Sequence, residues 1–373
     1  MKSLANQNGV VLVVTLAVIS VLMITAIQVS RIVRKSAISG SKEKNRFYAR
    51  QTALSGIEFA KLILEQDAQK NQIDSVQEFW ADPLWMVRAV EKLGYAENAL
   101  TITISDELSR LQVNALLKEF PGSEINPDQL WIWERLFKVM LEGNETIEDK
   151  DPAQFTNSIK DWMDSLDDDA VTGLSGAESD YYQALDPPYA CANGPFNHVS
   201  ELFSVKGITP DLFTKPLDKD MQEIIETVSP QIQMDQLITV HGLDDEFARG
   251  TKFRYTGKVN INTAPFEVLA ALLPEGMEMF AQELVDYRLQ KDEQGNDFIN
   301  TLDKGWYKRV IELPDKEKER FEKMIGYASH LFRVECTALE NSEKIILVAV
   351  LKREQHKISG KWICRTIQME RKY

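Results

Sequence analysis

An uncharged apolar run near the N-terminus constrains this chain more than any other feature. Val10–Ser30 contains no charged residue, and its polar members before the terminal Ser30 are Thr15, Ser20, Thr25 and Gln28. A helix needs about 20 residues to cross a hydrocarbon layer of about 30 Å. A secretory signal peptide instead has an apolar region of about 7–15 residues and a small-residue cleavage site at its end. The run therefore predicts a transmembrane helix over residues 10–30 that stays attached to the chain.

The flanks of this run carry two further signals. A short polar leader, residues 1–9, ends in Gly9, and the apolar run begins at once with Val10. A cut between these two residues, on the cytoplasmic side, would leave the anchor intact, which distinguishes prepilin-type leaders from secretory ones. Basic residues dominate the segment 31–50, where only Glu43 opposes them. The positive-inside rule alone would place that segment in the cytoplasm.

Composition limits the function of the part beyond the anchor. The chain has 373 residues, of which 44% are hydrophobic and 27% charged, enough for two or three folded domains. Its formal net charge of -14 disfavours nucleic acid as a partner. The three cysteines show no C-x-x-C spacing, so a zinc site is not expected. No P-loop, G-x-S-x-G or H-E-x-x-H motif occurs, and we expect a protein that is not an enzyme.

Hydrophobic periodicity predicts an α+β fold. Helical spacing continues past the membrane and predicts a stem over residues 31–70. Alternation over 100–104 and 111–114 predicts two strands joined by a hairpin turn at 105–109. Three strands, 331–338, 345–351 and 362–368, close the chain, and the apolar middle one should be central. We place the first part of the α/β body at 71–118, a helical insertion at 119–250, a second helical subdomain at 251–328 and the last antiparallel strands at 329–373.

The long helical block carries other local predictions. A helix should start at Asn126 or Asp128 beside Pro127. A second helical piece covers 76–93 and is interrupted by Pro83. Cys336 and Cys364 fall on the first and third of the closing strands. In a simple meander these strands lie about 9.5 Å apart, beyond the ~7 Å Cα limit for a disulfide, so we expect all three thiols to be free.

Carboxylates crowd the segment 161–186. They are Asp161, Asp164, Asp167, Asp168, Asp169, Glu178, Asp180 and Asp186. Like charges this dense repel one another unless a cation neutralises them. Calcium is the ion that six to eight oxygens on a glycine-containing loop would bind, although the D-x-[DN]-x-[DN]-G spacing of an EF-hand is absent. The alternative is a solvated acidic loop. Interleaved Trp162 and Tyr182 favour a packed segment.

The run VNINTAPFEVLAALLPEG at 259–276 resembles the opening of helix-hairpin-helix DNA-binding modules. Those modules hold phosphates through backbone N–H groups and nearby basic residues. The hairpin position here, 273–278, is acidic and apolar, so we expect the fold without DNA binding. Asn262 and Thr263 should cap the helix, with Val268, Leu269 and Leu272 in its core.

Several motifs in a fixed order resemble the minor pseudopilin K family of type II secretion systems over most of the chain. They are the Gly9-Val10 junction, D-W-M-D at 161–164, G-A-E-S-D-Y-Y at 176–182, P-P-Y at 187–189, V-S-E-L at 199–202 and V-N-I-N-T-A-P at 259–265. The resemblance implies a pilin-like antiparallel sheet on a long transmembrane stem helix, with a large all-α insertion and helix-hairpin-helix or SAM-like elements. It also implies calcium in the insertion, and by position its ligands would be Asp164, Asp167, Asp168, Glu178 and Asp180.

The same resemblance implies how the chain is processed and placed. A prepilin peptidase would remove the leader and methylate Val10 as the first mature residue. The mature chain would cross the bacterial inner membrane once, with its C-terminal domain in the periplasm, contrary to the positive-inside reading.

With Val10 as the first mature residue, Val14 is the fifth, and the resemblance makes this position informative. Most subunits of the superfamily carry Glu there, which can compensate the N-terminal amine of a neighbour, and an unpaired charge in the membrane costs at least about 2.5 kcal/mol. A subunit with Val14 suits the tip of the pseudopilus, where it would initiate assembly with the minor pseudopilins I and J and support export of folded proteins. Two alternatives stay open: a minor pilin of a type IV pilus, and a membrane-anchored helix-hairpin-helix DNA receptor.

Overall fold

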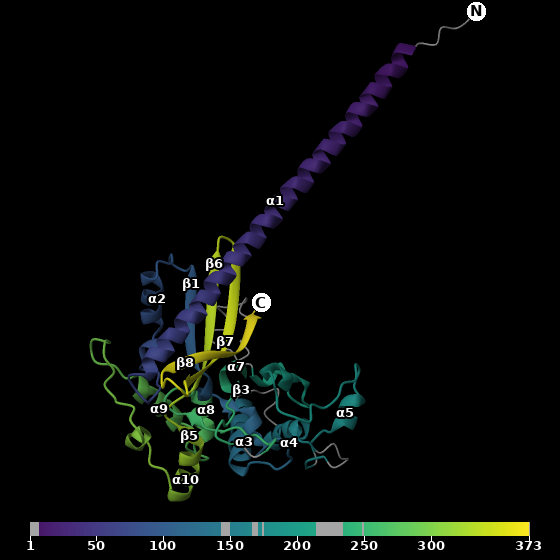
Figure 1. Ribbon diagram of the computed structural model, residues 1–373. Helices are drawn as coiled ribbons and strands as arrows, with labels where there is room; N and C mark the ends of the chain where they lie inside the picture. The colour runs from purple at the N-terminus through teal and green to yellow at the C-terminus, as the bar shows by residue number, and fades with distance from the viewer. Residues whose placement is uncertain are drawn as a thin grey trace, which may run out of the picture.

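A single helix dominates the computed structural model, which describes residues 7–142, 150–165, 171–173, 175–213, 234–247 and 250–372. This stem helix, α1 (Gln7–Ala68), runs for 62 residues, and its N-terminal half extends away from the body (Figure 1). Its apolar residues from Val10 to Val33 are exposed, and the helix is long and apolar enough to cross a membrane. The C-terminal half buries a stripe at helical spacing: Ala49, Ala53, Ile57, Ala60 and Leu64. The prediction of one continuous anchor and stem is confirmed.

A four-stranded antiparallel sheet receives that buried stripe. It has the order β1-β6-β7-β8, formed by β1 (Leu100–Asp106), β6 (Leu331–Glu340), β7 (Glu343–Gln355) and β8 (Trp362–Lys372). The three predicted C-terminal strands are therefore present, with the apolar β7 inside the sheet. The sheet and α1 enclose one hydrophobic core, and η1 (Phe79–Ala81) and α2 (Pro83–Lys92) cover its β1 side. Pro83 begins α2 and does not interrupt a longer helix, because Asp82 caps that N-terminus.

The predicted hairpin at 105–109 is wrong. β1 pairs with β6, and its end continues into η2 (Glu107–Ser109). β2 (Leu111–Gln112) then pairs in parallel with β3 (Ile238–Thr239). A surface turn is not possible here because Asp106 and Glu107 are buried and bonded to distant residues, including Asn260 and Arg333. Long-range polar pairing therefore overrides the local turn signal.

A second core lies in the helical part. It contains η3 (Val113–Leu116), α3 (Pro127–Leu141), α4 (Pro152–Met163), α5 (Ser179–Gln183), η4 (Val199–Ser204), η5 (Pro210–Phe213) and α7 (Met234–Leu237). Asn126 caps α3 as predicted, since its side chain accepts from the Asp128 N–H.

The helices of the second subdomain share this core. β4 (Val259–Asn260) pairs in parallel with β5 (Ile325–Gly326). The chain between these two strands forms α8 (Phe266–Leu272), α9 (Phe280–Leu289), η6 (Trp306–Arg309) and α10 (Asp315–Met324). Val268, Leu269 and Leu272 fill the core as predicted.

Asn262 and Thr263 do not cap α8, contrary to the prediction. The N-cap residue is Pro265, and no side chain caps the helix. The Asn262 amide donates to the backbone oxygens of Asp74 and Tyr327, and the Thr263 hydroxyl donates to Asp106. Thr263 therefore connects the second subdomain to β1 of the sheet, and Asn262 connects it to the segment that follows α1.

The three cysteines are free and buried. Cys336 pairs with Leu347 of β7, whereas Cys364 pairs with Arg353 on the other side of that strand. These partners are six residues apart, or about 20 Å along the strand, so no disulfide can join the two thiols.

Candidate functional site

The N-terminal helix presents the first set of predicted site residues to its surroundings. Gly9, Val10 and Val14 lie on one helix, α1, and all three are exposed. Val14 is 55% exposed and lies within the uncharged run, so this part of α1 presents a mainly apolar surface without charge. Such a surface fits lipid or the apolar helix of another subunit.

A buried acidic group in the insertion is the second site. We call Asp161, Asp164 and Glu178 the insertion cluster, because one oxygen of each lies within 4.8 Å of the others. Asp161 lies in the last turn of α4, Asp164 follows that helix as its C-cap residue, and Glu178 precedes α5. Their exposures are 0%, 0% and 5%. Buried carboxylates this close need a positive partner.

Lys160 supplies part of that positive charge. Its Nζ lies 3.5 Å from Asp161 Oδ1 and forms an ion pair with Asp164. Burial lowers the pKa of Lys160, but the hydrogen bond and the charge of Asp164 outweigh that effect, and the pKa is raised above its usual value. The Thr172 N–H also donates to Asp161 Oδ2 at 3.0 Å. Lys160 therefore pairs with two of the three carboxyl groups of the insertion cluster.

Gly176 closes the loop over this cluster. A Cβ atom at this position would lie 2.0 Å from Asp161 Oδ2 and 2.8 Å from the Thr172 backbone. Only glycine lets the chain approach the carboxylate so closely. Lys206 holds the loop from outside, since its Nζ donates to the Gly176 carbonyl at 3.0 Å.

Aromatic side chains form the wall behind the cluster. Trp162 meets Tyr182 edge to face at 4.9 Å between ring centroids and stacks on Phe196 at 6.4 Å. The Tyr189 hydroxyl donates to the Ser204 carbonyl and ties the P-P-Y segment to η4. The interleaved aromatic residues are therefore packed against one another.

The structure brings together only some of the predicted metal ligands. Asp164 and Glu178 meet in the insertion cluster, Asp180 is exposed on α5, and Asp167 and Asp168 lie outside the described residues. Asp161 was missed as a ligand candidate, although its spacing of three from Asp164 places both on one helix face.

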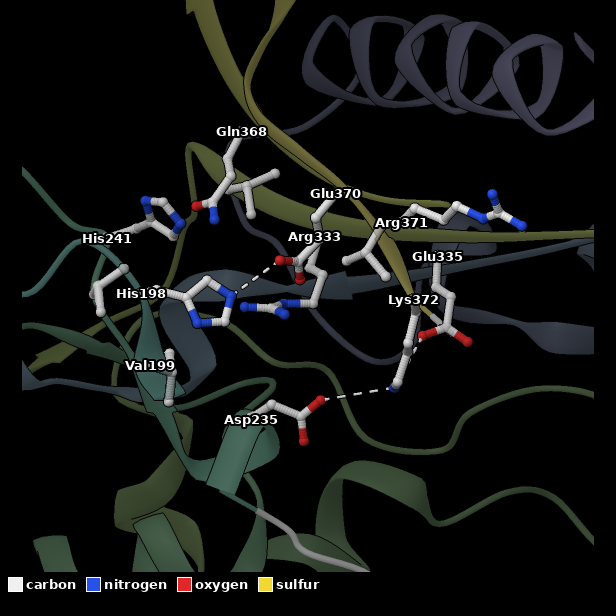
Figure 2. Close-up of a pocket in the computed structure, with 13 residues that line it drawn as sticks. His198, Val199, Asp235, His241, Arg333, Glu335, Gln368, Glu370, Arg371 and Lys372 are labelled. Atoms are coloured by element: carbon white, nitrogen blue, oxygen red, sulfur yellow. Dashed lines mark hydrogen bonds and ion pairs between the residues drawn. The ribbon is translucent and has the colours of Figure 1, made fainter. Parts of the chain in front are cut away.

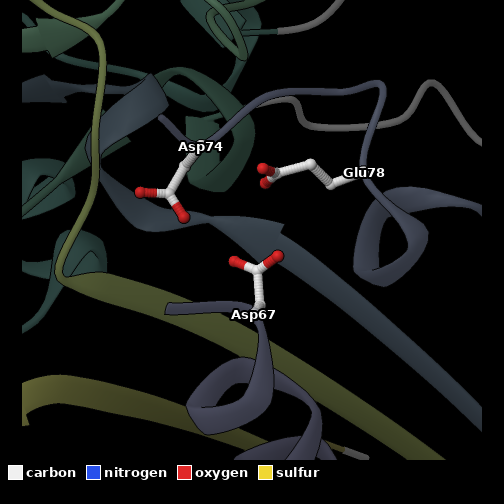
Figure 3. A group of neighbouring side chains, drawn as sticks. All are labelled: Asp67, Asp74 and Glu78. Atoms are coloured by element: carbon white, nitrogen blue, oxygen red, sulfur yellow. The ribbon is translucent and has the colours of Figure 1, made fainter. Parts of the chain in front are cut away.

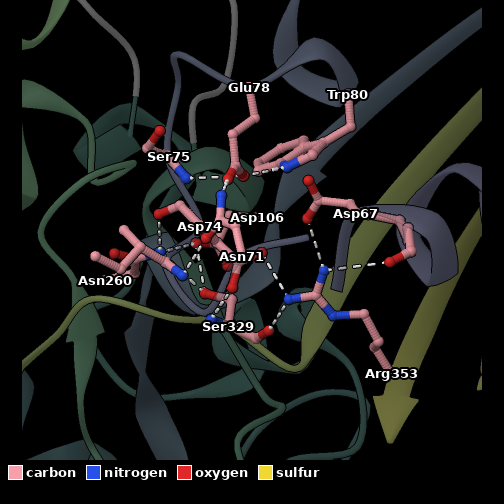
Figure 4. A network of polar contacts seen from close by, with 12 residues as sticks. Asp67, Asn71, Asp74, Ser75, Glu78, Trp80, Asp106, Asn260, Ser329 and Arg353 are labelled. Atoms are coloured by element: carbon pink, nitrogen blue, oxygen red, sulfur yellow. Dashed lines mark hydrogen bonds and ion pairs between the residues drawn. The ribbon is translucent and has the colours of Figure 1, made fainter. Parts of the chain in front are cut away.

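A second acidic group, which sequence reasoning missed entirely, lies at the end of the stem helix. The carboxyl groups of Asp67, Asp74 and Glu78, named here the junction cluster, point toward one another (Figure 3) and lie within 4.8 Å. Arg353 of β7 bridges Asp67 at 3.0 Å and Asp74 at 2.6 Å (Figure 4). No local motif marks these residues. The signal that could have found them is Arg353, a charged residue near the end of an apolar strand that should be covered. A charge at such a position needs an acidic partner.

A cavity of about 260 Å³ separates the insertion from the open face of the sheet. Figure 2 shows polar contacts across it: His198 Nε2 lies 2.9 Å from Glu370, and Lys372 lies 4.0 Å from Asp235. Arg333 reaches from this wall to the buried Glu107 at 2.8 Å. Charges of both signs alternate around the cavity, so they join the two parts of the body and do not form a pocket for one charge type.

The segment between α8 and α9 bears on the DNA-binding alternative. Glu275 forms an ion pair with Lys138, and Glu278 lies 2.6 Å from Arg135. Lys138 and Arg135 of α3 are thus paired with acids of this segment.

Comparisons with known proteins agree with the fold. The family model "Type II secretion system (T2SS), protein K" matches residues 109–217. Type II secretion system protein K of Aeromonas hydrophila is 27% identical over 267 residues, which cover 66% of this chain and 75% of that protein. The Pseudomonas aeruginosa protein K is 27% identical over 210 residues, or 54% of this chain and 58% of its own length.

A solved structure has the same architecture. The crystal structure of the GspK-GspI-GspJ complex from enterotoxigenic Escherichia coli aligns with a TM-score of 0.57 over 89% of this chain and 99% of the matched chain, at 15% identity. That likeness shows the fold, and the family model and relatives match the sequence independently. Taken together, these findings show that the chain is similar in sequence to protein K of type II secretion systems, the minor pseudopilins that its motifs resemble, and shares the fold of the solved GspK chain.

Proposed function

We propose that this minor pseudopilin is the tip subunit of the pseudopilus and initiates its assembly with the minor pseudopilins I and J. The observation that carries the proposal is where the bulk of the protein lies. The membrane half of α1 leaves one end of the sheet, and the helices α3–α5 and α8–α10 lie beyond the other end (Figure 1). A subunit stacked above this one would meet that helical mass.

Val14 supports the same position. The neighbour above would require an acidic partner for its N-terminal amine, and this chain offers valine in an uncharged run. Leaving that amine unpaired in an apolar bundle costs at least about 2.5 kcal/mol. The subunit can therefore end a stack and cannot continue one.

The anchor and the leader complete the proposal. Residues 10–30 would cross the inner membrane once, with the body in the periplasm. A prepilin peptidase would cut between Gly9 and Val10. The solved relative is a complex of GspK with GspI and GspJ, which supports subunits of those two types as partners here.

Counting copies per fibre tests the tip position. Full-length protein carrying an epitope tag is expressed with the other pseudopilins, and purified fibres are labelled with gold-conjugated antibody. We expect one label at one end of each fibre, and a 1:1:1 complex with I and J when the minor subunits are co-purified. Labels repeated along the shaft would contradict the proposal.

We also propose that the insertion cluster binds calcium. Its donors are carboxylate oxygens, the type that calcium prefers, and oxygens around a cation at 2.3–2.6 Å can lie up to about 5 Å apart. The 4.8 Å limit within the cluster fits that spacing. The loop bends tightly enough at Gly176 that a Cβ would strike Asp161 Oδ2, so the cradle is built around this carboxylate. Asp167, Asp168 and Asp180 are further candidates. Bound calcium would neutralise the acids and fix the loop to α4.

Thermal unfolding in calcium and in EDTA tests the metal. A ligand that binds only the folded state at 100 times its Kd adds about 2.7 kcal/mol of stability. We expect calcium to raise the Tm of the native chain and Asp161→Asn to remove that rise. Asp186→Asn, an exposed change of the same charge in the same segment, is the control and should keep it. An equal rise in Tm with calcium in both variants would show that this cluster is not the calcium site.

A further inference from the structure

The short segment 69–78 joins the two halves of the molecule. It leaves the end of α1 and packs against the second helical subdomain. The Asp74 N–H donates to the Tyr327 carbonyl at 3.0 Å, and the Asp74 carbonyl accepts from the Asn260 amide at 3.0 Å. Gln77 Nε2 donates to the carbonyls of Arg288 and Asn300 at 2.8 and 3.0 Å. The orientation of the subdomain on the stem therefore depends on this segment.

Carboxyl groups gather at this joint in excess of cations. Asp67, Asp74 and Glu78 lie within 4.8 Å of one another, and Asp106 lies behind them on the Asn260 amide (Figure 4). Among the described residues, the cation that forms ion pairs with these acids is Arg353, on Asp67 and Asp74. Lys70, beyond the end of α1, also acts on Asp67, and His330, before β6, lies near Arg353. Glu78 therefore adds a charge that has no ion-pair partner among the residues that the structure describes at this joint.

Hydrogen bonds position Glu78 without neutralising it. Its Oε2 accepts from the Trp80 indole at 2.6 Å and from the Ser75 N–H at 3.2 Å, and Oε1 accepts from the Asn71 amide. Burial raises the pKa of Glu78 to about 8, and the nearby charges of Asp67 and Asp74 add to that rise. Burial and Asp74 likewise raise the pKa of Asp67 to about 6, despite Arg353. A protonated carboxyl group can keep these acceptor roles, because it retains lone pairs.

We propose that segment 69–78 is a proton-dependent latch, which holds the second helical subdomain against the stem when Glu78 and Asp67 are protonated and loosens when both are ionised. Ionisation places three negative charges around one guanidinium, and the segment can relieve their repulsion by moving Glu78 into water. The hydrogen bonds of Asp74 and Gln77 to the subdomain would then open with it. This inference stands independently of the tip position and of calcium in the insertion.

The direction of the effect follows from proton linkage. The closed latch binds protons more tightly than the open one, so closure is favoured at low pH and lost as the pH rises through 6 to 8. For a carboxyl group whose pKa is 4.5 in the open latch and about 8 in the closed latch, the opening equilibrium is about 50-fold more favourable at pH 8 than at pH 6.

Hydrogen exchange measured by mass spectrometry tests the latch in the full chain held in detergent micelles. Peptides covering 69–82 are followed at pH 6 and pH 8, with rates corrected for intrinsic exchange. We expect their protection to fall at least tenfold at pH 8 in the native chain. Glu78→Gln keeps the shape and an acceptor oxygen but cannot ionise, so its protection should be the same at both pH values. Glu58→Gln, at an exposed position of α1, is the matched control and should behave as the native chain.

Three results would overturn the proposal. One is protection of 69–82 that does not change with pH in the native chain, and another is Glu78→Gln with the full native pH response. Each sample is also run in calcium and in EDTA, and protection restored at pH 8 by calcium alone would assign the joint to a metal instead. Peptides of β7 report whether a variant is folded. If Glu78→Gln does not fold, Asp67→Asn takes its place as the test. Removing that neighbouring charge must move the opening of the latch to higher pH.

Discussion

Replacing Arg353 by methionine should destabilise the protein more than any single surface change. The Arg353 side chain is 6% exposed on β7 and donates to Asp67 at 3.0 Å, to Asp74 at 2.6 Å and to the Ser329 carbonyl at 2.9 Å. Its guanidinium also lies 4.6 Å from the centre of the Phe332 ring. Methionine fills similar space without a charge, so the variant tests the charge and not the volume.

The magnitude follows from the two ion pairs. Each is worth about 4 kcal/mol of gross attraction at an effective dielectric constant of about 20, for charges about 4 Å apart. Part of that gain is offset by the desolvation of Arg353 itself. Removing one partner of a buried pair costs about 3–5 kcal/mol, because the remaining charge is left uncompensated. We therefore expect the free energy of unfolding to fall by about 3–5 kcal/mol at pH 8.

Equilibrium urea unfolding of the full chain in micelles measures this loss. Arg365→Met is the matched control, since Arg365 is 64% exposed and pairs with Glu354 on the adjacent strand. An exposed pair of this kind contributes about 0–1 kcal/mol. Adding Asp67→Asn and Asp74→Asn to Arg353→Met should recover most of the lost stability, because the two acids that Arg353 pairs with then carry no charge.

The pH dependence of this loss in stability can refute the electrostatic reasoning. Burial raises the pKa of Asp67 to about 6 and also raises the pKa of Asp74, so both acids become neutral as the pH falls. Without Arg353 they take up protons still more readily, and the loss at pH 5 should be smaller than at pH 8. An equal loss at both pH values, or a loss no larger than that of Arg365→Met, would refute the electrostatic reasoning.

Two further predictions concern other parts of the body. Gly176→Ala should cost about 1–3 kcal/mol of stability, because the new Cβ would lie 2.0 Å from Asp161 Oδ2. Gly40→Ala on the open surface of α1, where no atom lies within 4 Å, should be neutral or stabilising by up to about 1 kcal/mol, and equal unfolding curves for the two variants would contradict this account. Burial raises the pKa of Cys336 and Cys364 to about 12, so iodoacetamide at pH 8 should label neither thiol until the chain unfolds. Mass spectrometry of intact protein checks this, and rapid labelling of the native chain would show that the β-sheet core opens.

Local patterns predicted the elements that depend on neighbouring residues. The long apolar helix, the closing strands and the Asn126 cap of α3 were all correct, because membrane insertion, strand alternation and capping act over a few residues. The turn predicted at 105–109 failed because Asp106 and Glu107 bond to residues more than 100 positions away. Asn262 failed as a cap for the same reason, since its amide binds the Asp74 carbonyl.

The two acidic clusters likewise differ in how much of each could be predicted from the sequence. Sequence alone located the insertion cluster within its segment, because the carboxylates there are close neighbours and their density is itself a signal. It could not show that Asp161 turns inward beside Asp164, which depends on the packing of α4 against its aromatic wall. The anchor, the charge balance and the family motifs were likewise properties of the chain as written. Only the tertiary structure brought Asp67, Asp74 and Glu78 to Arg353, because residues about 280 positions apart become neighbours only when the stem helix packs on the sheet.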